Sequence, residues 1–240
     1  YVALVPNVRG VQNAAAAARK PDEVNGVVSA SETHNVANIN RTHEQSLAEL
    51  PAMVKIAHDA GMKITMSLST TFGCPFEGRV HEDVVMEFVE RFRVAGFDGI
   101  SLADTTGMAN PRQVRELVTK VLERFPPPDE CYYTLHFHNT RGMGLANVVA
   151  GIDAGVRSFD GSLAGLGGCP FAPGATGNIC TEDMVNMLED MGCDTRIDLA
   201  KLLAVARRIP AVVGHDTPGQ VMKAGQTLEL HEPPATTRTP

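Results

Sequence analysis

The feature that most constrains the fold is a regular alternation of short apolar runs with amphipathic segments. The six runs are YVALVP, VNGVVSAS, MKITMSLST, DGISLAD, YYTLHFHN and VRSFDGSLAG. The intervening segments repeat apolar residues at the three- to four-residue spacing of a helix, as at Leu47, Leu50, Met53, Val54 and Ala57. Strands that alternate with helices predict a parallel sheet covered by helices.

Two architectures are compatible with this pattern, an open doubly wound sheet and a closed (β/α)8 barrel. No GxGxxG motif follows the first run, which argues against a dinucleotide-binding sheet. Polar residues follow the strands at their carboxyl ends, where a barrel assembles its chemistry: Asn7, Ser69, Asp104, His136 and His138. We therefore expect an α/β fold, a (β/α)8 TIM barrel of which this chain supplies about six units.

The barrel accounts for most, but not all, of the 240 residues. We expect residues 1–195 to form the barrel domain with its strands 3 to 8, so that two strand–helix units precede Tyr1. Residues 196–228 are expected to form C-terminal helices, over 197–208 and 216–226. Residues 229–240, which end in TTRTP, are expected to be a disordered tail.

Composition excludes several classes of partner. The net charge of -7 leaves no broad basic face for nucleic acid, and no run approaches the roughly 18 apolar residues that cross a bilayer. Five cysteines, an odd number without a CxxC pair, do not form a disulfide framework. With no export signal, the chain fits a reducing compartment, a cytoplasm or an organelle matrix.

The HxH of LHFHN is the first candidate for chemistry. His136 and His138 lie two residues apart on a predicted strand, so both side chains leave one face, while Leu135 and Phe137 face the helices. Two imidazoles at a barrel mouth suit a divalent metal, or form a hydrogen-bonded pair without one. Asp104 either N-caps the following helix, fixes the turn, or acts in a site. For Arg141, binding of a carboxylate or phosphate competes with a solvated loop position.

The second candidate is the irregular segment GLGGCPFAPGATGN, residues 165–178. A thiol in such a glycine- and proline-rich loop does not fill a helix core, so Cys169 is a candidate nucleophile or general acid. Asn178 either forms a turn or offers its amide oxygen to a hard cation. Cys74 is a packed or a functional thiol. Thr181, followed by two acidic residues, is expected to be a helix N-cap.

Several of these motifs together resemble one family. HFHNTRGMGLAN, the cysteine loop followed by TEDMV, SLADTTG, FGCPFEG and VPNVRG are similar to 3-hydroxy-3-methylglutaryl-CoA lyase and its bacterial relatives. That family belongs to a metal-dependent lyase and synthase superfamily built on a (β/α)8 barrel. The resemblance extends from about Tyr1 to Leu203, and the cysteine loop and the HxH are its specific parts.

The resemblance implies roles for six residues. A Mg²⁺ or Mn²⁺ ion would be bound by His136, His138 and Asn178, and His136 is also a candidate base. Cys169 would be the mobile-loop thiol that transfers a proton, Asp104 an active-site acid, and Asn38 a contact to the coenzyme A portion. Two departures follow from the same comparison. Asn139 stands where the animal lyases carry Asp, and the family's Arg-Asp pair after the first barrel strand has no counterpart among these residues.

The activity implied is cleavage of 3-hydroxy-3-methylglutaryl-CoA to acetoacetate and acetyl-CoA, as in leucine degradation and ketone-body formation. We expect an acyl-CoA substrate, a homodimer or higher homo-oligomer, and a bacterial cytoplasm ahead of a mitochondrial matrix. Three alternatives remain: a lyase for a related ester such as citramalyl-CoA, a condensing synthase of the isopropylmalate type, and an inactive truncated fragment or binding scaffold. The synthase lacks the cysteine loop.

Overall fold

The computed structural model describes residues 1–127, 132–168, 170, 174, 176–230 and 232. It divides into two compact units. The first comprises Tyr1–Asp160 and Gly167–Asn178, and the second comprises Gly161–Leu166 and Ile179–Pro240. We expected a domain boundary at residue 195, and that boundary stays a prediction about domain organisation.

The first unit is built on six parallel strands in the order β1-β2-β3-β4-β5-β6, so every strand pairs with its sequence neighbours. The strands are β1 (Val2–Val5), β2 (Glu23–Ser29), β3 (Lys63–Ser69), β4 (Gly99–Asp104), β5 (Tyr132–Phe137) and β6 (Ser158–Asp160). The helices are α1 (Val8–Ala15), α2 (Glu32–Ile39), α3 (His43–Asp59), α4 (Glu82–Ala95), α5 (Pro111–Arg124) and α6 (Gly144–Asp153). This is the expected partial (β/α)8 barrel.

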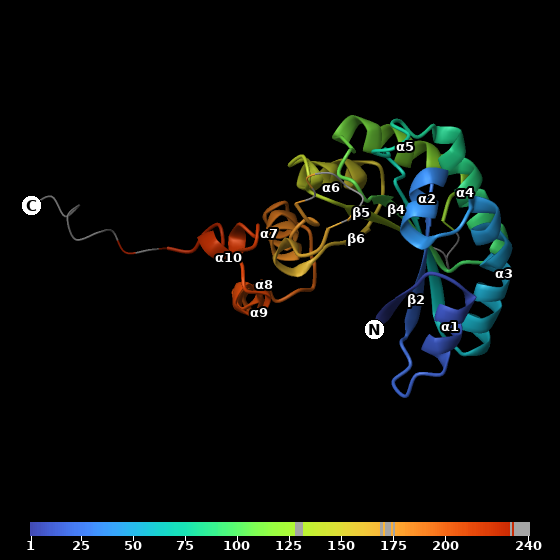
Figure 1. Cartoon of the computed structure of the whole chain (residues 1–240). Helices are drawn as coiled ribbons and strands as arrows, with labels where there is room; N and C mark the ends of the chain where they lie inside the picture. Colours follow the sequence, from blue (N-terminus) through green and yellow to red (C-terminus); the bar gives the residue numbers. More distant parts are fainter. Residues whose placement is uncertain (128–131, 169, 171–173, 175, 231, 233–240) are drawn as a thin grey trace, which may run out of the picture. The chain divides into compact units, whose positions relative to one another are not determined.

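One face of this sheet is apolar and covered by helices. Leu68, Leu102 and Leu135 are register partners on three adjacent strands, and each is at most 1% exposed. Figure 1 shows α3, α4 and α5 ranged along one face of the sheet. Burial of each leucine stabilises the fold by about 1.5–3 kcal/mol, which explains why these strands are apolar at alternate positions.

The opposite face of the sheet is polar, and its side chains bond across the strands. Ser67 Oγ donates to Asn25 Oδ1 at 3.0 Å, and the Thr134 and Ser158 hydroxyls lie 2.9 Å apart. The hydroxyl of Tyr132 on β5 donates to Glu23 Oε2 on β2 at 2.8 Å. Because β3 and β4 separate those two strands, this contact requires the sheet to curl toward its polar face.

The second unit is a small helical cluster. Its helices are α7 (Thr181–Asp190), α8 (Leu199–Ala206), α9 (Ile209–Val213) and α10 (Val221–Ala224), after a short 3-10 turn at Leu163–Gly165. Its buried core consists of Ala164, Val185, Leu199, Leu203, Ala206 and Met222. The expected helices over 197–208 and 216–226 thus correspond to α8 and α10, and α9 lies between them. Of the expected tail, residues 231 and 233–240 lie outside the described residues.

The start of α7 differs from the expectation. Thr181 is the first helical residue and Cys180 is the N-cap, without a side-chain hydrogen bond. The two acidic residues of the first turn, Glu182 and Asp183, do more than interact with the helix dipole. Glu182 is fully buried and accepts from the Ala164 amide at 3.0 Å, while Asp183 accepts from the Gln220 and Val221 amides. Both carboxylates therefore satisfy backbone donors of other segments.

Helix α2 has no counterpart among the segments predicted from apolar periodicity. Ser31 caps it by accepting from the His34 amide, and the buried residues of α2 are His34 and Asn35. A helix whose buried face is polar has no apolar repeat to detect. Among the described residues, no helix combines the length and the apolar character needed to cross a membrane.

Candidate active site

The two histidines of the HxH lie side by side at the carboxyl end of β5. Their ring centroids are 5.1 Å apart and their planes meet at 67°. Leu135 and Phe137 are fully buried on the opposite face. The predicted alternation is therefore confirmed, and both imidazoles project from the polar face of the sheet.

His138 is the more buried of the two, with 6% of its surface exposed. Burial, followed by the proximity of His136, lowers the pKa of His138 to about 4, against a smaller opposing effect of Asp160. At neutral pH the ring is therefore uncharged and keeps a lone pair. Its Nδ1 is buried and makes no hydrogen bond to any described residue.

His136 has a carboxylate partner that sequence reasoning missed. Its Nδ1 lies 2.5 Å from Oδ1 of Asp160, the last residue of β6. The two residues are register partners, so their side chains leave the same face. The available signal was the position of Asp160 itself, a polar residue at the end of a strand, as for His136 and Asp104.

Asp104 lies at the end of β4, opposite Phe137 in the register, and is 1% exposed. Its Oδ1 accepts from the Met108 and Ala109 amides at 2.8 and 3.1 Å, so it holds the following turn. Its Oδ2 is buried without a hydrogen bond to the described residues. Burial raises the pKa of Asp104 to about 6, although the two amides, His136 and Arg141 oppose the rise. The structure thus shows the turn-fixing role, and the active-site role stays a prediction.

The residues after the HxH also stabilise turns. Arg141 donates through Nη1 to the carbonyls of Thr106 and Gly107 at 3.2 and 2.9 Å, so it holds the turn after β4, and binding of an anion by the rest of the guanidinium stays a prediction. Asn139 Oδ1 accepts from the Gly144 amide at 3.1 Å, at the first residue of α6. The Asn139 side chain therefore satisfies the first amide of α6.

The loop of residues 165–178 returns to the histidines at its far end. Asn178 forms an isolated antiparallel bridge with His138, and the Asn139 amide donates to the Gly177 carbonyl at 3.0 Å. Gly167 lies against Asn178, because a Cβ on Gly167 would fall 2.8 Å from the Asn178 amide nitrogen. Gly167 and Asn178 are thus placed near the HxH. Cys169 lies outside the described residues.

The structure also places two other residues singled out in the sequence, Asn38 and Cys74. Asn38 is exposed on α2, and its coenzyme A contact stays a prediction. Cys74 is fully buried and donates to Ser31 Oγ at 3.1 Å, which favours the packed thiol over the functional one.

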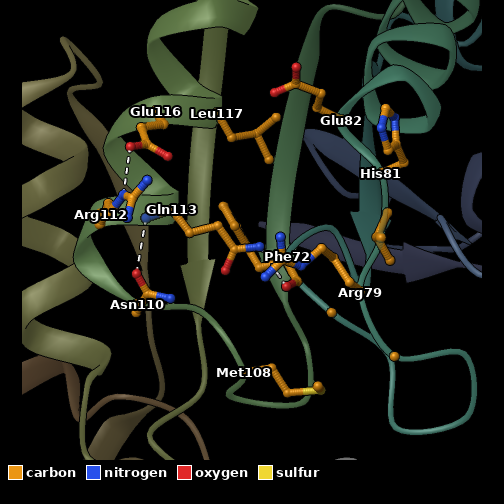
Figure 2. A pocket seen from close by; sticks show the side chains of 13 residues that line it. Phe72, Arg79, His81, Glu82, Met108, Asn110, Arg112, Gln113, Glu116 and Leu117 are labelled. Carbon is orange, nitrogen blue, oxygen red and sulfur yellow. Dashed lines mark hydrogen bonds and ion pairs between the residues drawn. The ribbon is translucent and has the colours of Figure 1, made fainter.

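A separate pocket of about 630 Å³ lies between the segment after β3 and the start of α5 (Figure 2). Gln113 Nε2 closes one side by donating to the Phe72 carbonyl at 2.8 Å. The charged side chains that line the pocket are largely paired, since Arg112 forms a salt bridge with Glu116 and Glu82 forms one with Lys120. None of the predicted site residues lines it, and we assign it no part in catalysis.

The donor set at the rim fits a divalent cation in composition. It offers two imidazoles and one amide oxygen, from His136, His138 and Asn178, and the partnerless buried nitrogen of His138 is an atom that a cation or water satisfies. Among the described residues, no group of three His, Cys, Asp or Glu side chains could hold a metal. Binding of a cation by His136, His138 and Asn178 therefore stays a prediction.

A curled parallel α/β sheet with a histidine pair at its carboxyl rim is the architecture of a TIM-barrel enzyme. The HMGL-like family model matches residues 1–209. This chain belongs to the HMGL-like family, and the resemblance inferred from the motifs is confirmed.

Named relatives agree with the family. The chain is 44% identical over 220 residues to hydroxymethylglutaryl-CoA lyase of Bacillus subtilis, covering 92% of this chain and 72% of the relative. It is 43% identical over 225 residues to (R)-citramalyl-CoA lyase of Chloroflexus aurantiacus, covering 94% and 69%. An HMG-CoA lyase of Acinetobacter baumannii, solved with coenzyme A and 3-methylmalate, is 50% identical with a TM-score of 0.91, covering 98% of this chain and 75% of the other.

Proposed function

We propose that this chain is the catalytic barrel of a carbon–carbon lyase that cleaves 3-hydroxy-3-methylglutaryl-CoA to acetoacetate and acetyl-CoA. The observation that supports it is the pair His136 and His138, 5.1 Å apart at the strand rim. The chain that carries this pair is 44% identical to a relative named for that activity.

The proposed reaction is a retro-Claisen cleavage. A divalent cation held by His136, His138 and Asn178, Mg²⁺ or Mn²⁺, supplies Lewis-acid polarisation when bound. A base removes the proton of the tertiary hydroxyl. As the C2–C3 bond breaks, the oxygen of that hydroxyl becomes the ketone oxygen of acetoacetate. The electron pair of that bond passes to the acetyl-CoA enolate. Cys169 then protonates the enolate carbon and completes acetyl-CoA.

The candidate base is His136, or the family's Asp of the Arg-Asp pair. Nε2 of His136 is the nitrogen not engaged by Asp160, so its one lone pair can bind the cation or accept a proton, but not both. His136 is therefore a base only when its Nε2 does not bind the cation, and the family's Asp is the base when it does. Asp104 is buried with a raised pKa, so it is suited to donating a proton near pH 6. Asn38, exposed on α2, is proposed to contact the coenzyme A portion.

A second candidate substrate is citramalyl-CoA, which would yield pyruvate and acetyl-CoA by the same bond cleavage. It is favoured by the 43% identity to the Chloroflexus enzyme, nearly equal to that of the Bacillus lyase. The 3-methylmalate in the Acinetobacter structure is likewise a short hydroxy diacid.

The test is turnover of both esters by the 240-residue chain with Mg²⁺ or Mn²⁺, with the keto acid product identified by mass spectrometry. Acetoacetate supports the first proposal, and pyruvate alone supports the second. Absence of turnover with either ester, in a chain shown to be folded and to bind Mn²⁺, would reject the lyase activity for this chain and support the inactive fragment.

The wider setting is also proposed. We infer a homodimer or higher homo-oligomer and a bacterial cytoplasmic location, with leucine degradation or ketone-body formation as the metabolic context. The bacterial relative from Bacillus supports the location. Light scattering of the purified chain tests the oligomeric state, and a monomer would contradict it.

A further inference from the structure

The neighbour of the HxH on β6 is Asp160, the register partner of His136. In the β5–β6 register, Thr134 pairs with Ser158 and His136 with Asp160. Both pairs are polar and bonded across the strands, at 2.9 Å between hydroxyls and 2.5 Å between imidazole Nδ1 and carboxylate Oδ1. The backbone register therefore holds Asp160 against one edge of the His136 ring.

This contact constrains the imidazole in two ways. A carboxylate only accepts hydrogen bonds, so Nδ1 of His136 carries a proton, and in the neutral imidazole Nε2 then has the lone pair. The bond also restricts rotation of the ring, whose plane stands at 67° to that of His138. Histidines that bind metals commonly donate their other N–H to such a carboxylate.

A role in stability explains the pair less well. The Asp160 side chain is 50% exposed and that of His136 27%, and exposed ion pairs contribute at most about 1 kcal/mol. Within the described part of the chain, no lysine or arginine forms a salt bridge with Asp160. The carboxylate is thus directed to the ring that carries the proposed chemistry.

We propose that Asp160 is a positioning residue that holds His136 in the Nδ1–H tautomer and aims its Nε2 at a divalent cation. This inference rests on the proposed function, because His136 is a ligand only there. Asp160 is not itself a ligand in this proposal, so an acceptor of the same shape should replace it.

The experiment compares Asp160→Ala and Asp160→Asn in the full 240-residue chain, with Asp153→Ala as the matched control. Asp153 is a carboxylate of similar exposure, 53%, on α6. Manganese binding is followed by the electron paramagnetic resonance of free Mn²⁺. We expect Asp160→Ala to weaken binding about 10- to 100-fold and Asp160→Asn less than about threefold. Asp153→Ala should bind as the parent does.

A second measurement needs no metal. Long-range ¹H–¹⁵N correlation of the histidine rings should show His136 as the Nδ1–H tautomer in the parent and in Asp160→Asn, but not in Asp160→Ala. Equal Mn²⁺ affinity of Asp160→Ala and the parent would overturn the positioning role while leaving the lyase proposal intact. Equal losses of Mn²⁺ affinity in Asp160→Ala and Asp160→Asn would also overturn it. They would show that the negative charge of Asp160, or its direct binding to the cation, is what matters. If the parent binds no Mn²⁺, the cation site and this inference fail together.

Discussion

The hydroxyl of Tyr132 on β5 donates a hydrogen bond to Glu23 Oε2 on β2 across 2.8 Å. Glu23 Oε1 accepts from Thr65 of β3 as well, so the carboxylate joins three strands. Gly99 of β4 lies beneath the tyrosine, because a Cβ there would fall 2.9 Å from Tyr132 Cζ and 2.8 Å from Thr65 Cγ2. The curl of the sheet thus depends on glycine at position 99, where any side chain would collide with Tyr132 and Thr65.

Replacement of Gly99 should therefore destabilise the first unit. We expect Gly99→Ala to cost about 1–3 kcal/mol of unfolding free energy, through overpacking against the two side chains. Urea denaturation followed by circular dichroism measures it. In a Tyr132→Ala background the same substitution should cost less, since one of the two clashes is gone. An equal cost in both backgrounds would show that the ring does not matter.

The contact between Gly167 and Asn178 predicts a selective effect on cation binding. Gly167→Ala places a methyl group where the Asn178 amide lies, and it places an alanine at a backbone φ of +94°. We therefore expect it to displace Asn178 and to weaken Mn²⁺ binding several-fold. Gly174→Ala is the matched control, with φ of +69° and open space around its Cβ. Titration of Mn²⁺ into both variants distinguishes loop strain, which they share, from the amide contact.

Asp104 predicts how stability changes with pH. Its pKa is raised to about 6 in the folded chain against about 3.9 when unfolded, so folding favours the protonated form. Its contribution is full below about pH 4 and is lost as the pH rises through 6, by up to about 3 kcal/mol. Relative to the parent, Asp104→Asn should therefore gain stability between pH 4 and 6 and change no further above. Urea denaturation at each pH measures the difference, and a flat difference would contradict the raised pKa.

The proton-transfer role proposed for Cys169 predicts a loss of turnover without a loss of cation binding. Cys169→Ser should lower kcat about 100-fold or more, because a hydroxyl is a far weaker acid than a thiol. Steady-state kinetics with the cleaved ester measures it, and the Mn²⁺ affinity serves as the internal control. Cys74→Ser, at a buried packed thiol, should leave kcat near the parent value in the folded fraction. Equal kcat in Cys169→Ser and the parent would remove the thiol from the reaction.

Much of the fold was accessible from local pattern. Period-two alternation placed Leu135 and Phe137 toward the helices and the two histidines on the other face, and the structure confirms both. Strand–helix repetition predicted the parallel order of six strands. Helix α2 escaped because it buries His34 and Asn35 instead of apolar residues.

The sequence by itself determined the class of fold and the family, and it predicted residues for the proposed chemistry, because periodicity and short motifs are properties of neighbouring positions. Only the tertiary structure decided which carboxylate meets His136, that Asp104 holds a turn, and that Glu23 and Tyr132 meet across two strands. Those contacts join residues 4 to 109 positions apart. The longer ones depend on strand register and sheet curl, which arise when the whole sheet packs and which no local pattern encodes.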